Sequence, residues 1–248
     1  MSSERQLLNS IDPWWGEHVH RYNQVLPYLS STDKVIDLAC GTGFGSDIIA
    51  EHTNGNVIGG DIAADAIKEC NANWKKTNLQ FEVLDGTALP YADCYFDKII
   101  SFETIEHTTA YEKMINEFYR VLKPSGIAFI STPNFPVNSP SGKVLNPYHT
   151  QEFTYDELKL LLENIFSSVT IFGQKYSRYD DGKVNKVGKF VEWFFNIIGI
   201  RKLPYSFKTT ITKRIYGKSL YPMPDDFSMV ADIKELLKCK TFFCVCRK

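Results

Sequence analysis

Three carboxylates close short apolar runs in the first third of the chain. Asp37 lies just ahead of the glycine-rich stretch Cys40–Gly45, and Asp61 and Asp85 follow the next two runs. Glycine lets the backbone come close to a ligand because no Cβ intervenes. A helix that follows such a turn offers free N–H groups and a positive dipole end, which suit an anionic group. The acids and the turn therefore predict one ligand pocket.

The positions of these acids indicate the kind of ligand. Asp61 follows Gly43 by eighteen residues, near the spacing at which a carboxylate accepts hydrogen bonds from a ribose diol. Asp85 could accept from an exocyclic amine such as that of adenine. Asp37 would repel a pyrophosphate, but it could orient a loop that holds an ammonium-bearing amino acid. The set favours a nucleoside with a cationic amino-acid tail, although the glycine pattern alone also fits a dinucleotide or a plain tight turn.

Strand-like and helix-like patterns alternate along the chain around these residues. Apolar runs indicate strands, 3.6-residue periodicity indicates helices, and Thr154–Glu157 is a capping box that opens a helix. This alternation predicts a mostly parallel sheet that is covered on both faces. The predicted strands are 34–39, 56–61, 79–84, 96–102, 127–131, 168–172 and 241–247.

Six stretches together resemble the class I S-adenosylmethionine-dependent methyltransferases. The segment Glu17–Tyr22 resembles one that precedes the glycine-rich turn in bacterial sugar and small-molecule methyltransferases, so the chain is similar to their O-methyltransferases in particular. The resemblance covers about residues 15 to 172 and the terminal strand, and it implies S-adenosylmethionine as the cofactor. The matching stretches are Val35–Gly43, Gly60–Ile62, Leu84–Pro90, Phe96–Ser101, Glu106–His107 and Leu122–Gly126.

The resemblance also implies a fold. It predicts an α/β, Rossmann-like, doubly wound sheet of seven strands, mostly parallel, with an antiparallel final strand. The whole chain, 1–248, is then a single methyltransferase domain. Its predicted parts are an N-terminal helical cap (1–30), a cofactor-binding core (31–172), a basic and aromatic insertion (173–238) and a terminal strand (239–248).

Each cofactor contact is implied by the same resemblance. The turn and its acid would line the methionine part of the cofactor. Asp61 would bind the ribose hydroxyls, and the residues after the second and third strands would contact the adenine. Two residues at the end of the fourth strand would border the sulfonium. Arg21 or Tyr22 of the N-terminal segment could reach the cofactor carboxylate. The full predicted set is Tyr22, Asp37, Ala39, Gly41, Gly43, Asp61, Ile62, Asp85, Gly86, Phe102 and Glu103.

Two histidines are candidates for the base that a hydroxyl acceptor needs. His149 lies in the string Asn146–Phe153, which resembles a string in glycan methyltransferases, and it is the preferred candidate. His107 follows Glu106 just past the fourth strand and is the second. A base near the methyl group typically accelerates transfer 10²–10⁴-fold. The alternative for each histidine is a structural hydrogen bond that orders its loop. No metal site is predicted, because Glu103 and Glu106 alone are too few carboxylates.

The segment Lys175–Lys218 carries eleven Lys or Arg and three Asp or Glu, a net charge of +8. The whole chain has a net charge of −1, so the rest carries −9. The segment could hold the phosphates of a nucleotide-linked or lipid-linked sugar. It could also make a peripheral membrane contact through aromatic residues such as Trp193. A solvated insertion or a homodimer contact is the third interpretation.

Composition excludes several classes of protein. Hydrophobic residues make up 44% of the 248 residues and charged residues 23%, which excludes a mainly disordered chain. The near-zero net charge argues against a nucleic-acid coat protein, and no apolar run is long enough to span a bilayer. The six cysteines lack zinc-ribbon spacing. Reduced thiols and a polar N-terminus favour a cytoplasmic protein.

The sequence therefore predicts a cytoplasmic enzyme that methylates a hydroxyl of a sugar or glycan-related acceptor, in polysaccharide or natural-product assembly. A quinone-like or other small acceptor is the alternative within the enzyme class. A dehydrogenase and a non-catalytic binding module are the alternatives outside it.

Overall fold

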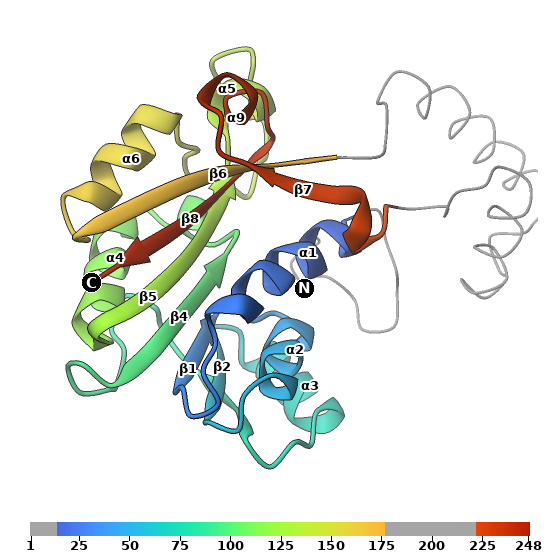
Figure 1. The fold of residues 1–248 in the computed structure, drawn as a ribbon, viewed down its shortest axis with the longest axis vertical. Helices are drawn as coiled ribbons and strands as arrows, with labels where there is room; N and C mark the ends of the chain where they lie inside the picture. The colour runs from blue at the N-terminus through green and yellow to red at the C-terminus, as the bar shows by residue number, and fades with distance from the viewer. Residues whose placement is uncertain (1–13, 177–221) are drawn as a thin grey trace, which may run out of the picture. The chain divides into compact units, whose positions relative to one another are not determined.

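The computed structural model describes residues 14–176 and 222–248, and their centre is one twisted sheet (Figure 1). Eight strands lie in the order β3-β2-β1-β4-β5-β8-β6-β7. The strands are β1 (Val35–Leu38), β2 (Val57–Asp61), β3 (Leu79–Val83), β4 (Phe96–Phe102), β5 (Leu122–Pro133), β6 (Ser168–Tyr176), β7 (Phe227–Val230) and β8 (Thr241–Arg247).

The sheet confirms the predicted mixed topology and corrects its strand count. β1, β2, β3, β4 and β5 pair in parallel, whereas β8 runs antiparallel to both β5 and β6. The prediction of seven strands was wrong, because Phe227–Val230 forms an additional short strand at the edge. That run of four residues lies in the stretch that we had assigned to the insertion, and it is too short to give a clear strand pattern.

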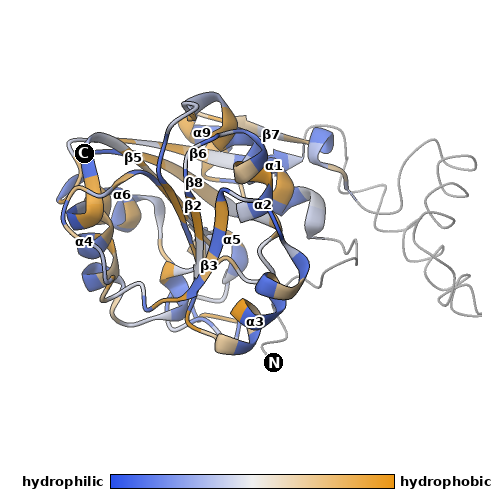
Figure 2. Cartoon of the chain, turned by 90° about the horizontal axis from the view of Figure 1, so that it is seen from below, coloured by the Kyte–Doolittle hydropathy of each residue, from blue (hydrophilic) through white to orange (hydrophobic). Residues whose placement is uncertain are grey.

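Helices cover both faces of this sheet, which confirms the doubly wound arrangement. Alternating strand residues enter two separate apolar layers, so Ile36 and Ile99 face one layer while Val35 and Ile100 face the other. The first layer contains apolar residues of α4 and α6, and the second contains those of α2 and α3. In Figure 2 orange is concentrated on the strands, and blue turns mark the outer sides of α3 and α4.

The helices follow the strands as the periodicity predicts. The capping box is confirmed, since the Thr154 hydroxyl accepts from the Glu157 N–H and the Glu157 carboxylate accepts from the Thr154 N–H. The helices are α1 (Trp15–Val25), α2 (Phe44–Glu51), α3 (Ala64–Asn73), α4 (Tyr111–Val121), α5 (Phe135–Asn138), α6 (Tyr155–Glu163) and α9 (Ile233–Leu236), with short 3₁₀ helices η1 (Leu26–Tyr28), η2 (Ile105–His107) and η4 (Pro224–Asp226).

By its internal packing the chain divides into two compact units. The first contains Tyr22–Lys175 and Met229–Lys248, and it holds all the predicted site residues. The second is described only at 14–21, 176 and 222–228. Most of the basic segment 175–218, with Trp193, lies outside the described residues. Among the helices that are described, none is both long and apolar enough to cross a membrane.

Candidate active site

The glycine-rich turn joins β1 to α2 through backbone that side chains disfavour. Ala39, Gly41 and Gly43 have φ values of 60°, 57° and 79°. Gly43 also lies against the core, because a Cβ at this position would stand 2.7 Å from the Phe81 ring and 2.9 Å from the Cys70 sulfur. Gly43 is the N-cap of α2 and no side chain caps that helix end. The first N–H groups of α2 therefore face the turn without a side-chain acceptor of the helix's own.

Asp37 lies at the base of this turn and is fully buried. Its carboxylate accepts hydrogen bonds from the Ser46 hydroxyl at 2.6 Å and the Tyr22 hydroxyl at 3.1 and 3.2 Å. Burial, with a smaller contribution from the nearby Asp61 charge, nevertheless raises the pKa of Asp37 to about 7. The Tyr22 ring is packed between Phe44 and Phe102. Tyr22 thus reaches the acid of the turn, and a contact of Tyr22 with a cofactor carboxylate stays a prediction.

Asp61 ends β2 beside the turn. The register aligns Leu38 with Gly60, so the ends of β1 and β2 meet at one edge of the sheet. The Asp61 carboxylate accepts from the Gly41 N–H at 3.0 Å and from the Ala63 N–H at 2.9 Å, one on each oxygen. These two bonds fix the carboxylate at the rim. The next residue, Ile62, leaves 72% of its surface exposed.

Asp85 and Gly86 follow β3 at the same edge. The Asp85 carboxylate is exposed, and its oxygen Oδ1 accepts from both the backbone N–H and the hydroxyl of Thr87 at 2.8 Å. These hydrogen bonds keep the pKa of Asp85 below its ordinary value. Gly86 lies against Met114, whose terminal carbon would stand 3.1 Å from a Cβ at this position. The acid is therefore ionised and held in one orientation.

Phe102 and Glu103 lie where β4 ends, next to β1 at the centre of the sheet. Glu103 has a φ of 50°, and its N–H donates to the Ser131 carbonyl at 3.0 Å. The Ser131 hydroxyl donates to the Glu103 carboxylate at 2.7 Å. The order of strands reverses between β1 and β4, and ligands of open α/β sheets bind outside the carboxyl ends of the strands at such a point.

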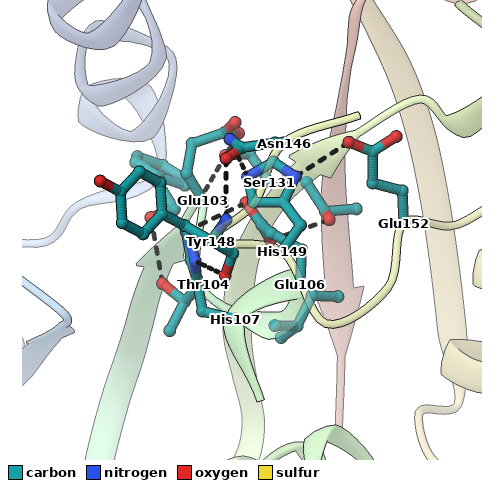
Figure 3. Close-up of polar contacts among 12 residues, drawn as sticks. Glu103, Thr104, Glu106, His107, Ser131, Asn146, Tyr148, His149 and Glu152 are labelled. Carbon is teal, nitrogen blue, oxygen red and sulfur yellow. Dashed lines mark hydrogen bonds and ion pairs between the residues drawn. The ribbon is translucent and has the colours of Figure 1, made fainter. Parts of the chain in front are cut away.

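His107 and His149 come together above this edge, although 41 residues separate them (Figure 3). Their ring centroids are 4.9 Å apart and the rings are nearly perpendicular. The loop that carries His149 is tied to η2, because the Gln151 amide donates to the carbonyls of Ile105 and Thr108 and the Thr150 N–H donates to Glu106. The structure therefore unites the two candidate bases in one site.

Each histidine has a partner that holds its ring. His149 Nδ1 lies 2.9 Å from a carboxylate oxygen of the buried Glu152, whose other oxygen accepts from the Ser139 hydroxyl. His107 Nδ1 lies 3.0 Å from the Tyr148 carbonyl. Both acceptors require a proton on Nδ1, so in the neutral form of each ring the lone pair is on Nε2.

Similarity to known proteins identifies the domain. A protein-family profile for a methyltransferase domain matches residues 29–184. The chain belongs to this methyltransferase-domain family. A probable S-adenosylmethionine-dependent methyltransferase of Mycolicibacterium smegmatis is 32% identical over 151 residues, which are 60% of this chain and 57% of that protein. The chain therefore matches less than two thirds of the length of such curated relatives.

Two further comparisons bear on the methyltransferase domain. Phosphoethanolamine N-methyltransferase 3 of Arabidopsis thaliana is 35% identical over 105 residues, 42% of this chain and 21% of that protein. A SAM-dependent methyltransferase structure from Archaeoglobus fulgidus has a TM-score of 0.58 and 19% identity, with 94% of each chain covered. At that identity the structural likeness shows the fold.

S-adenosylmethionine is the methyl donor of this family, and the residues at the sheet edge fit it. Its amino group would be matched by the buried carboxylate of Asp37. A ribose diol would be matched by Asp61, because each of its oxygens accepts one backbone bond and retains a second lone pair. The adenine ring could pack on the exposed side chain of Ile62. Ala39, Asp85, Phe102 and Glu103 lie at the same edge, and their contacts with the cofactor stay predictions.

The pKa of Asp37 predicts how the stability of the methyltransferase domain changes with pH. Its pKa is 3.8 when unperturbed and about 7 in the folded chain. Between these values the folded chain holds a proton that the unfolded chain has released, so the free energy of unfolding falls as the pH rises. Three pH units correspond to about 4 kcal/mol. Between pH 4 and 8 the free energy of unfolding of wild type should fall by about this much relative to that of Asp37→Asn. Urea denaturation at a series of pH values measures both proteins. Parallel profiles would contradict the assignment.

The Gly43→Ala variant tests how tightly the glycine-rich turn is packed against the core. Gly142→Ala is a matched control, because Gly142 has a similar φ of 75° but nothing lies within 4 Å of its Cβ position. Both variants strain the backbone, which costs about 1 kcal/mol or more. Only Gly43→Ala also meets Phe81, so it should cost about 1 to 3 kcal/mol more in denaturation and should weaken cofactor binding. An equal loss of free energy of unfolding in the two variants would show that a Cβ at Gly43 fits without displacing Phe81.

Sequence reasoning missed the residues that hold the histidines. Glu152 lies three residues after His149, and that spacing was the available signal. Glu106 was noted as a neighbour of His107 and as one of two carboxylates too few for a metal site, yet its side chain is fully buried and accepts from the Thr132 hydroxyl at 2.9 Å. No pattern in the sequence brings Glu106 to His149, because the loop that carries His149 folds back over η2.

Proposed function

We propose that the protein transfers a methyl group from S-adenosylmethionine to a hydroxyl of a sugar or glycan-related acceptor, and that His149 takes the hydroxyl proton. The observation that supports this proposal is the His149–Glu152 pair, with 2.9 Å between Nδ1 and the carboxylate oxygen. The pair lies on a loop that is hydrogen-bonded to η2. η2 itself follows Glu103 and the end of β4 closely in the chain. An oriented imidazole at this edge suits proton removal from an acceptor.

The chain's residues contribute orientation and proton transfer. S-adenosylmethionine supplies the methyl group and leaves as S-adenosylhomocysteine. A sugar hydroxyl is a weak nucleophile at neutral pH, and a well-placed base is worth about 10²–10⁴-fold. Glu152 holds the proton on Nδ1, so Nε2 of His149 is the atom that accepts the hydroxyl proton. The acceptor oxygen gains the methyl group and loses that proton, which His149 then passes to water.

The surroundings of His149 support a small polar acceptor. Tyr148 and Leu145 precede it and leave 48% and 60% of their surfaces exposed. Apolar and aromatic surface with a few oriented polar groups is typical of small-molecule sites. A cover by the loop 133–153 would exclude water before transfer. His107, beside His149, is the second candidate for the base.

An amine acceptor is the second candidate function, because one relative is named as a phosphoethanolamine N-methyltransferase. That match covers only 42% of this chain. The quinone-like acceptor stays a further alternative. Contacts of the basic segment with a phosphate-bearing sugar, a membrane surface or a second copy also stay predictions, as does a cytoplasmic location.

A methyl-transfer assay with labelled S-adenosylmethionine tests the proposal. The acceptor panel should contain nucleotide-linked sugars, free glycans, a catechol and phosphoethanolamine. We expect label in a sugar methyl ether, and we expect His149→Ala to remove it. Label in phosphoethanolamine or the catechol, with none in any sugar, would overturn the proposed acceptor and leave the cofactor site standing.

A further inference from the structure

The cluster around His149 contains a third group that the proposed base mechanism does not use. One potential ligand atom from each of Glu106, His107 and His149 lies within 4.8 Å of the other two. The Glu106 carboxylate oxygen is 4.0 Å from His107 Nε2. Figure 3 shows these side chains converging from η2 and the loop after Asn146. Two imidazoles and one carboxylate form a donor set that proteins use for divalent cations.

The hydrogen bonds of the histidines prepare them for the same role. Imidazoles that bind metals almost always donate their other N–H to a carboxylate or a backbone carbonyl. His149 has Glu152 at 2.9 Å from Nδ1, and His107 has the Tyr148 carbonyl at 3.0 Å. The Asn146 amide nitrogen lies 2.9 Å from His149 Nε2, with its oxygen fixed by the Tyr148 N–H. With its oxygen facing the Tyr148 N–H, the amide would donate to Nε2, in agreement with a proton on Nδ1.

The third group is placed to supply charge. The Glu106 carboxylate is completely buried, and one of its oxygens accepts from the Thr132 hydroxyl. A cation beside a buried carboxylate offsets the cost of removing that charge from water. The side chain of His149 is 9% exposed, whereas that of His107 is 35% exposed. The site thus has a buried wall and one open side, as catalytic cation sites have.

We propose that Glu106, His107 and His149 bind one divalent cation of the zinc or manganese class, which would hold and activate the acceptor hydroxyl. Imidazole ligands favour such cations over Mg²⁺, which prefers oxygen. Ligand atoms around such an ion stand roughly 3.3 Å apart, so His107, the most exposed of the three, rotates inward and the Asn146 amide leaves Nε2.

This inference rests on the proposed methylation of a hydroxyl and changes how the hydroxyl is activated. A nitrogen that holds the cation has no lone pair for a proton. The cation instead lowers the pKa of the bound hydroxyl, and the proton goes to water. The remaining balance is unchanged, since the oxygen gains the methyl group and S-adenosylhomocysteine leaves.

Metal binding is tested first without any acceptor. The chelator-treated protein is titrated with Mn²⁺, Zn²⁺ and Mg²⁺ by calorimetry, and bound Mn²⁺ is examined by pulsed electron paramagnetic resonance. We expect one Mn²⁺ or Zn²⁺ per chain, weaker Mg²⁺ binding, and nitrogen couplings from imidazole. Glu106→Gln, His107→Ala and His149→Ala should each weaken binding at least tenfold. Glu152→Gln, which weakens the support of His149 and also alters the contact with the Ser139 hydroxyl, should weaken cation binding about 10–100-fold.

The control variant is His52→Ala, since His52 is exposed at the end of α2 and contacts the Ile48 carbonyl. It should bind the cation like wild type. Retained binding of S-adenosylhomocysteine shows that each variant is folded. Absence of stoichiometric binding in wild type, or equal affinity in all the variants, overturns the cation site.

Methyl transfer then separates the two proposals. Transfer to a hydroxyl that persists in excess chelator overturns the cation site and leaves the proposed function with His149 as base. Specific cation binding without transfer to any hydroxyl overturns the proposed function and leaves the cation site. Transfer that stops with chelator and returns with Mn²⁺ supports the cation site and the proposed methylation of a hydroxyl, with the cation in place of His149 as the group that activates the hydroxyl.

Discussion

His149→Ala is expected to lower the turnover of methyl transfer by about 10²–10⁴-fold, the usual contribution of a base that activates a nucleophile. The affinity for S-adenosylhomocysteine should stay near that of wild type, because His149 contacts Asn146 and Glu152 and none of the acids of the cofactor pocket. Single-turnover assays and calorimetry measure the two quantities separately. The same direction of change holds if the ring is a cation ligand.

Two variants calibrate that result. His52→Ala should leave turnover unchanged. Glu152→Gln keeps the shape of the side chain but weakens the hold on His149 Nδ1, so we expect a smaller loss than for His149→Ala, in turnover and not in cofactor affinity. Full activity of His149→Ala would remove this histidine from the mechanism and leave it the role of ordering its loop.

Asp61→Ala is expected to weaken cofactor binding at least about 100-fold. Hydrogen bonds to a charged group contribute about 1.5–3 kcal/mol each, and a ribose diol would make two with this carboxylate. The change also frees the N–H groups of Gly41 and Ala63, which Asp61 holds at 3.0 and 2.9 Å. Equilibrium dialysis with labelled S-adenosylhomocysteine measures the loss.

Asp61→Asn separates the two contributions of this carboxylate. Asparagine can still accept one backbone hydrogen bond, so it should preserve more of the turn while losing the charge that favours the diol. Asp156→Ala is the surface control, because Asp156 is exposed in the first turn of α6. An Asp61→Ala protein that is folded and binds as tightly as wild type would remove Asp61 from the site.

The position of the three acids could be predicted from the sequence because each of them lies at the end of a strand. Asp37, Asp61 and Asp85 each follow an apolar run, and parallel strands bring their carboxyl ends to one edge of the sheet. The helix that begins after Thr154 was predictable for a similar reason, since a capping box is a local signal.

The acceptor half could not be predicted in this way. The contact between His107 and His149 depends on Gln151 binding the carbonyls of Ile105 and Thr108, and no local pattern encodes that long-range pairing. The start of β5 could not be predicted from the local pattern either. The sequence predicts a strand that begins at 127, but pairing with β4 extends β5 back to Leu122, through Ser125 with a φ of 64°.

We infer that the turn and the three acids form a site for adenosine joined to a cationic amino acid. A calorimetric titration of the purified chain with S-adenosylmethionine and, separately, with NAD⁺ tests it most directly. We expect one saturable site per chain for S-adenosylmethionine and no heat above that of dilution for NAD⁺. Saturable binding of NAD⁺ together with no response to S-adenosylmethionine would contradict it.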